Sequence, residues 1–174
     1  PMMDSADAPH PTAMHYFVRL LETKGVLLRD YTQNVDGLEA KAGITDESVI
    51  ASHGTLATTS CAACATPTPR EQNAEVLAQM ASGKSPKCPL CGGPLKPDIV
   101  FFGQPLSERF HEHRAADLAE CDLLIIAGTS LTVRPFAELV HEVRTDVPRI
   151  LINNDAVGPF KALSKKPRDV PAPS

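Results

Sequence analysis

The sequence of 174 residues lacks any apolar run close to the roughly 20 residues that a membrane-spanning helix needs, so we expect no membrane segment. It opens without a secretory signal, which makes a reducing compartment the default and predicts that its five cysteines are not paired in disulfides. It has no internal repeat and no excess of basic residues. The formal net charge of −4 argues against a broad nucleic-acid footprint.

What is present is the composition of a globular protein, with 43% hydrophobic and 22% charged residues. The length fits one domain, or one domain with a small insertion. Helical and strand patterns alternate: we predict helices over residues 11–24, 38–41, 71–80, 106–121 and 135–144, and strands over residues 26–31, 98–103, 122–130 and 149–154. This alternation predicts an α/β fold with a parallel sheet.

Polar side chains gather where three of the predicted strands end. Because the carboxyl ends of strands line the ligand crevice of open α/β sheets, the recurrence favours a binding site for a ligand rich in hydroxyls and amides, such as a nucleotide. The alternative for the first cluster is an ordinary turn, in which Asp36 caps the following helix. The clusters are Gln33, Asn34 and Asp36; Gly128, Thr129 and Ser130; and Asn153 and Asn154.

Four cysteines form two pairs with two residues inside each pair: Cys61 with Cys64, and Cys88 with Cys91. This spacing lets two thiolates face one ion, and two such pairs make a tetrahedral sulfur site suited to zinc. No His, Asp or Glu stands at ligand spacing within the quartet, so the predicted zinc is structural. The alternative is a set of unrelated buried thiols or redox pairs. The fifth cysteine, Cys121, is predicted to be a small buried apolar residue.

Taken together, the motifs resemble those of sirtuins, the NAD-dependent protein-lysine deacylases. In order they are "YTQNVDGLE", "SHG", the two cysteine pairs, "KPDIVFFG", "AGTSL" and "LIN". The resemblance runs from about Pro9 to Asp155 and is closest to class I deacetylases of the cytoplasmic type. It implies a Rossmann-like parallel sheet that lacks its first βα unit, with a small inserted zinc-binding module. It also implies removal of acetyl groups from lysine, giving nicotinamide and O-acetyl-ADP-ribose.

The resemblance also assigns roles to individual residues. His53 matches the general base, and Asn34 and Asp36 match catalytic residues that, with Gln33, receive nicotinamide and its ribose. Contacts to the adenosine side of NAD are implied for Gly128, Thr129, Ser130, Asn153 and Asn154. Contacts to the acetylated peptide are implied for Val35, Val100, Phe101, Phe102 and Gly103.

The chain departs from the family in three places. Nothing matches the glycine-rich phosphate loop or the mobile cofactor loop, which we expect before Pro1, and no GxGxxG motif is present. Residues 164–174 resemble the approach to the adenine loop and then end in prolines. Gln104 stands where most relatives carry a glutamate. We therefore interpret the chain as an incomplete sirtuin.

We divide the chain into a first Rossmann-like part (1–58), a zinc-binding module (59–97), a second Rossmann-like part (98–160) and a proline-rich, disordered tail (161–174). The expected partners are acetylated proteins, histone or non-histone, without membrane or nucleic acid. The expected compartment is the cytoplasm, with the nucleus as a second location. Two alternatives remain: a catalytically dead, zinc-containing peptide-binding module, and a zinc-ribbon nucleic-acid binder, against which the acidic balance argues.

Overall fold

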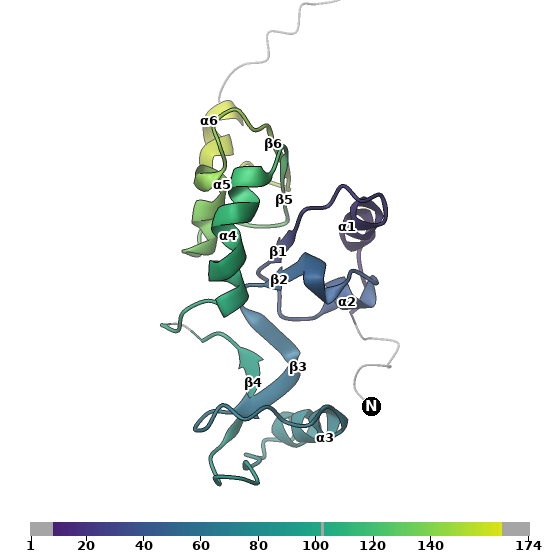
Figure 1. Cartoon of the computed structure of the whole chain (residues 1–174), viewed down its shortest axis with the longest axis vertical. Coiled ribbons are helices and arrows are strands. Elements are labelled where there is room, and N and C mark those ends of the chain that lie inside the picture. Colours follow the sequence, from purple (N-terminus) through teal and green to yellow (C-terminus); the bar gives the residue numbers. More distant parts are fainter. Residues whose placement is uncertain (1–8, 102, 165–174) are drawn as a thin grey trace, which may run out of the picture. The chain divides into compact units, whose positions relative to one another are not determined.

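The computed structural model describes residues 9–101 and 103–164, and it divides into two compact units, Pro1–Glu112 (unit 1) and His113–Ser174 (unit 2) (Figure 1). Each unit is described by itself. The boundary falls inside one helix, α4 (Glu108–Glu120). None of the helices in the described ranges is both long and apolar enough to cross a membrane.

Unit 1 opens with α1 (Ala13–Thr23), whose first turn is closed by a capping box between Thr12 and His15. The helix is amphipathic, yet none of its residues is fully buried, and Tyr16 and Leu20 are about half exposed. After α1 the chain reaches β1 (Asp30–Thr32), which pairs in parallel with β2 (Val49–Ala51). Between these strands lie α2 (Leu38–Lys41) and the short helix η1 (Asp46–Ser48).

The strand predicted over residues 26–31 is wrong at its start. The paired strand is β1, because only its three residues find partners on β2, and residues 26–29 form no ladder with the described chain. A run of apolar residues supplies strand propensity, but a strand also needs a neighbour at the right register. The core of this part is built on Ile50 and Phe110, both fully buried, and the Phe110 ring packs edge-on against Tyr31 at 6.0 Å.

The second part of unit 1 is an antiparallel hairpin of β3 (Gly54–Cys61) and β4 (Leu95–Ile99), with α3 (Arg70–Ala81) beside it (Figure 1). A buried polar contact fixes α3 on β3: the backbone N–H and hydroxyl of Thr59 both donate to Asn73 Oδ1, at 2.9 and 2.8 Å. The module boundaries that we placed after residues 58 and 97 fall inside these two strands. The strands therefore run continuously from the candidate site into the cysteine module.

Unit 2 contains a second parallel pair, β5 (Leu124–Ala127) with β6 (Arg149–Ile152). The helix predicted over residues 135–144 is shorter and is divided into η2 (Phe136–Glu138) and α5 (Leu139–Glu142), because Val143 adopts an extended backbone. The unit ends with η3 (Gly158–Phe160) and α6 (Lys161–Ser164). The first four residues of the predicted tail are thus helical, and residues 165–174 lie outside the described residues.

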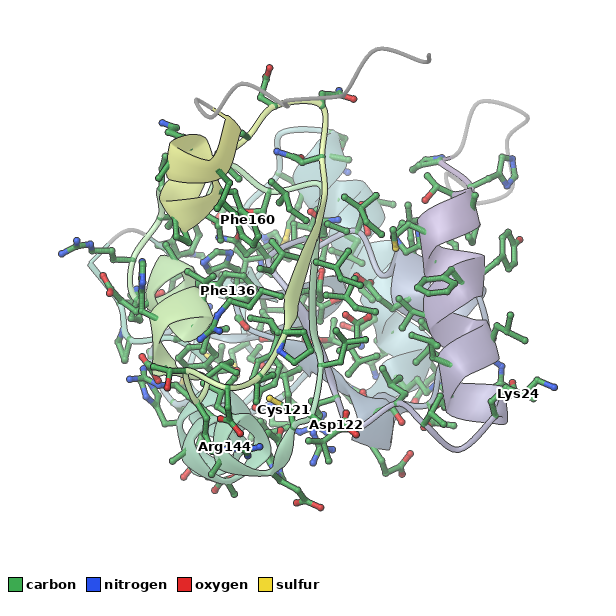
Figure 2. All side chains as sticks on the ribbon, turned by 90° about the horizontal axis from the view of Figure 1, so that it is seen from above. Lys24, Cys121, Asp122, Phe136, Arg144 and Phe160 are labelled. Carbon is green, nitrogen blue, oxygen red and sulfur yellow. The ribbon has the colours of Figure 1, made fainter. Side chains whose placement is uncertain are left out.

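The α/β class is confirmed, with a correction to the sheet. The described residues form two separate parallel pairs and one antiparallel pair, in place of one continuous parallel sheet. In unit 2, Cys121 follows α4 and is only partly buried, close to Asp122 and Arg144 (Figure 2). Desolvation raises the pKa of the Cys121 thiol. The buried position that we predicted for Cys121 is therefore only partly reached, because the residue lies where α4 ends.

Candidate functional site

The loop between β1 and α2 carries the first polar cluster, and its backbone is held by its own side chains. Asp36 Oδ1 accepts a hydrogen bond from the Leu38 N–H at 3.1 Å, and Thr32 Oγ1 accepts one from the Asn34 N–H at 3.1 Å. Gly37, at φ 70°, starts α2 in a left-handed conformation that favours glycine. Asp36 therefore closes a turn onto the first residue of α2, but the N-cap of the helix is Gly37 and not Asp36. Asn34 is exposed on the loop.

His53 lies at the end of β2 and is oriented by the same loop. Its Nδ1 atom is 3.0 Å from the backbone carbonyl oxygen of Gln33. A carbonyl only accepts, so Nδ1 carries a proton, and in the neutral tautomer with this proton the lone pair lies on Nε2. The carbonyl of His53 in turn accepts a hydrogen bond from the Val100 N–H at 2.9 Å. The structure thus brings Gln33, His53 and Val100 together from three segments of the sequence.

Of the residues assigned to the acetylated peptide, Val100 takes part in this contact and Val35 lies two residues after Gln33. The Val35 carbonyl accepts a hydrogen bond from the Leu56 N–H at 2.9 Å. The strand predicted to run to residue 103 ends at Ile99, so the next residues are not part of β4. Phe101 is 48% exposed, and its N–H donates to Gln104 Oε1 at 2.9 Å. Gly103 is exposed with φ 87°, and Phe102 lies outside the described residues.

In unit 2, the polar residues after β5 and β6 are joined to one another. The Gly128 N–H donates to the Ile152 carbonyl at 3.1 Å, and Asn153 Nδ2 donates to the Thr129 carbonyl at 3.1 Å. The hydroxyls of Ser130 and Thr132 are 2.8 Å apart. These contacts form one hydrogen-bonded edge at the carboxyl ends of two parallel strands. Asn154 follows this edge as an exposed residue.

The four predicted metal ligands form one cluster at the end of the hairpin. Their sulfur atoms lie within 4.8 Å of one another. Three of the sulfur pairs are Cys61–Cys91 at 3.4 Å, Cys64–Cys91 at 3.4 Å and Cys64–Cys88 at 3.8 Å. A tetrahedral zinc site with bonds of about 2.3 Å places its sulfur atoms about 3.8 Å apart. The donor set and its spacing fit a zinc ion held by four thiolates, which can be a structural zinc.

Backbone groups support the sulfur cluster. The N–H groups of Ala63 and Gly93 point at Cys61 Sγ and Cys91 Sγ, each at 3.4 Å. A Cβ atom at position 93 would lie 3.0 Å from Cys61 Sγ and 2.8 Å from the Ala63 side chain. Glycine is therefore required at position 93 by the closeness of the sulfur atoms.

The thiols influence one another's ionisation. The Thr66 hydroxyl and then its backbone N–H lower the pKa of the Cys64 thiol to about 6, with smaller contributions from Cys91 and Cys61. The Gly93 N–H lowers the pKa of Cys91, but the neighbouring thiols outweigh it and raise that pKa to about 12. One thiolate therefore forms easily, and its negative charge disfavours the ionisation of the neighbouring thiol. A divalent cation offsets this repulsion with its positive charge.

The sequence analysis missed a pair of acidic residues close to the loop. Burial, and then the charge of Glu39, raise the pKa of Asp30 in β1 to about 6, and Glu39 in α2 is only 6% exposed. The signal that was available is a carboxylate, beside Arg29, inside a predicted strand that is otherwise apolar or aromatic. The burial of Glu39 had no such signal, because a helix of four residues has no readable apolar face.

The sequence of the chain is similar to one protein family and to several known proteins. Residues 2–135 match a family model described as the Sir2 family. The chain is 49% identical over 160 residues to the mouse protein named NAD-dependent protein deacetylase sirtuin-3, covering 92% of this chain and 46% of that protein. It is 46% identical over 151 residues to a Danio rerio protein named NAD-dependent protein deacetylase sirtuin-2, covering 85% and 39%. A Candida albicans protein named NAD-dependent protein deacetylase HST2 is 42% identical over 157 residues, covering 90% and 46%. The chain thus spans less than half the length of these relatives.

Proposed function

Because the chain belongs to the Sir2 family, we propose that it forms part of an NAD-dependent protein-lysine deacetylase, and that it supplies the catalytic base and a structural zinc site. The names of the relatives support this reaction. Since the chain spans less than half of each relative, the activity belongs to the proposed complete enzyme.

The observation that carries the proposal is the contact between His53 and Gln33. It fixes the ring orientation and places a proton on Nδ1, so that a neutral ring carries its lone pair on Nε2, which is the form that a general base needs. The base is attached through a backbone carbonyl to the loop that we assign to nicotinamide.

The remaining residues are assigned to three parts of the site: the nicotinamide end of NAD, its adenosine end and the acetylated peptide. NAD would supply the ribose carbon from which nicotinamide leaves. The acetyl group would be transferred to the same ribose. Gln33, Asn34 and Asp36 are proposed to bind the nicotinamide end. The edge formed by Gly128, Thr129, Ser130, Asn153 and Asn154 is proposed to bind the adenosine end. The exposed segment with Val100, Phe101, Phe102 and Gly103, together with Val35, is proposed to bind the acetylated peptide.

Acetylated proteins are accordingly the proposed partners, and the names of the relatives as protein deacetylases support this. We propose both acetylated histones and acetylated non-histone proteins as substrates. We propose the cytoplasm as the main compartment and the nucleus as a second one. This proposal is supported only by the similarity of the sequence motifs to those of the cytoplasmic type. The acidic balance supports the absence of direct nucleic-acid binding.

The experiment that tests the function is a graft. This chain replaces its matching region in the mouse relative, and nicotinamide release is measured with NAD and an acetylated peptide. His53→Ala should lower turnover by about 10²–10⁴-fold, the usual contribution of a positioned base. His10→Ala, an exposed histidine, is the matched control and should leave turnover unchanged. Near-normal turnover in His53→Ala would refute the assignment.

The alternative function is peptide binding without turnover. A pocket of about 460 Å³ lies between α3 and the second cysteine pair, with Val76, Leu90 and Leu95 among its lining residues. A binding module would use such a surface. A graft that binds the acetylated peptide, folds and holds zinc, yet releases no nicotinamide, would favour this alternative over the deacetylase.

A further inference from the structure

Phe101 is an exposed aromatic residue whose backbone and ring both have defined contacts. It lies two residues after β4, in the segment assigned to the acetylated peptide, and it is 48% exposed. A side chain that is already ordered loses little conformational freedom when a ligand binds it. The residues that hold Phe101 in place therefore bear on the affinity of this segment for a peptide.

Gln104 contacts both polar backbone groups of Phe101. The Phe101 N–H donates to Gln104 Oε1 at 2.9 Å, and the Gln104 N–H donates to the Phe101 carbonyl at 3.0 Å. Gly103, at φ 87°, supplies the left-handed backbone that lets the chain return on itself here. Gln104 is exposed, so hydrogen bonding and not burial fixes its side chain.

Lys96 in β4 contacts the ring of the same residue. Its ammonium lies over the Phe101 ring, 5.6 Å from the centroid. The same ammonium donates to the carbonyls of Pro97 at 3.1 Å and Ile99 at 3.4 Å. A cation over the face of an aromatic ring is attracted by the electrons of that ring. Lys96 therefore connects the end of β4 to the Phe101 side chain.

The charge of Lys96 is directed at these groups and not at a carboxylate. In the part of the chain that the structure describes, Lys96 forms no ion pair. The acidic residue of the same strand, Asp98, accepts a hydrogen bond from the Thr58 hydroxyl at 2.6 Å. The contacts of the Lys96 ammonium are thus two backbone oxygens and one aromatic ring, which all belong to the end of β4 and the segment after it.

These contacts adjoin the residue that we propose as the catalytic base. Ile99, whose carbonyl accepts from Lys96, is the last residue of β4. The next residue, Val100, donates its N–H to the His53 carbonyl at 2.9 Å, and Phe101 follows directly. The contacts of Phe101 therefore fix its ring relative to a backbone that is bound to the base.

We propose that Lys96 and Gln104 are positioning residues for the acetylated peptide. Gln104 fixes the backbone of Phe101, Lys96 holds its ring, and the exposed part of the ring binds an apolar part of the peptide. The inference rests on the proposed function, because the segment with Phe101 is assigned there to the peptide.

The test measures peptide binding by the graft in the absence of NAD. The probe is a fluorescent peptide with leucine on both sides of an acetyl-lysine, and its anisotropy is followed. Gln104→Ala and Lys96→Met should each weaken binding by about three- to tenfold, the equivalent of one hydrogen bond or cation–π contact. Gln104→Glu should bind like the parent, because a carboxylate oxygen accepts the same hydrogen bond. Lys84→Met is the matched control at an exposed lysine outside this segment, and it should also bind like the parent.

Two further measurements separate positioning from a structural role. In a graft that already carries Phe101→Ala, neither Gln104→Ala nor Lys96→Met should weaken binding further, because both act through the ring. In turnover, the KM for the peptide should rise, while kcat and the KM for NAD should change by less than about twofold. Weaker binding that comes with loss of zinc or a lower melting temperature would make the role structural and overturn the proposal.

Amide hydrogen exchange of the 174-residue chain provides a readout that does not depend on the graft. The Phe101 amide should exchange faster in Gln104→Ala than in the parent or in Gln104→Glu. Equal exchange in all three, or peptide binding that is unchanged or tighter in Gln104→Ala and Lys96→Met, would overturn the proposal. A parent graft that binds no peptide would overturn it as well. A parent graft that binds the peptide but releases no nicotinamide refutes only the proposed function.

Discussion

Replacement of Arg149 by lysine should destabilise unit 2 by more than the loss of any single surface ion pair. The guanidinium of Arg149 donates to four backbone carbonyls: those of Val140 at 3.1 Å, Val143 at 2.7 Å, Arg144 at 3.2 Å and Val147 at 2.8 Å. These carbonyls belong to the last turn of α5 and to the connection that follows it. One side chain on β6 therefore satisfies the acceptors at which the short helix ends.

The magnitude follows from the number of acceptors left without a donor. Lysine keeps the charge but carries its donors on one nitrogen atom, so it cannot reproduce the planar fork that reaches four separate oxygens. We expect at least two carbonyls to lose their partner. An unsatisfied buried acceptor costs about 1–3 kcal/mol, and water replaces part of this because Arg149 is only partly buried. The expected loss is about 2–4 kcal/mol, a large fraction of the roughly 5–15 kcal/mol of a typical domain.

The assay is urea unfolding followed by circular dichroism, with amide hydrogen exchange of β5 and β6 to locate the change in unit 2. The control is Arg134→Lys, because the Arg134 side chain is 82% exposed and pairs with Glu138 on the surface. That control should lose less than about 0.5 kcal/mol. Equal unfolding free energies for Arg149→Lys and Arg134→Lys would refute the reasoning.

Three further predictions concern the other parts of the chain. Gly93→Ala should release zinc, measured by elemental analysis, because its Cβ would lie 3.0 Å from a ligand sulfur. The control is Gly83→Ala, whose Cβ meets nothing within 4 Å; it should keep the metal even though its φ of 80° disfavours alanine. Asp36→Asn retains the oxygen that accepts from the Leu38 N–H, so in the graft it should keep the melting temperature and lose at least about tenfold in nicotinamide release, or about 1.4 kcal/mol of barrier. Asp36→Ala should in addition lose about 1 kcal/mol of stability, because that hydrogen bond is lost. Early melting with normal turnover in both variants would make Asp36 a turn residue only. Hydrogen bonds, the strongest from the Thr45 hydroxyl, lower the pKa of Glu22 from 4.5 to about 2. The stabilisation by ionised Glu22 should therefore be complete above pH 4.5 and disappear as the pH falls toward 2. A Thr45→Val variant with the same acid unfolding profile as the parent would contradict this.

The metal cluster could be predicted from the sequence because its information is local. A pair of cysteines separated by two residues already places two sulfur atoms on one side of a turn, and only the meeting of the two pairs requires the fold. The order of the motifs was equally readable, and it predicted the family. The long helices were predicted for a similar reason, since their periodicity repeats over several turns within one segment.

The tertiary structure decided what depends on distant partners. The length of β1 was set by the three residues of β2 that pair with it, and the antiparallel pairing of β3 with β4 by contacts across more than thirty intervening residues. The orientation of His53 depends on a backbone carbonyl that carries no sequence signal. The four acceptors of Arg149 and the burial of Glu39 are of the same kind, because hydrogen bonds to backbone atoms and the loss of hydration arise only when separate segments come together.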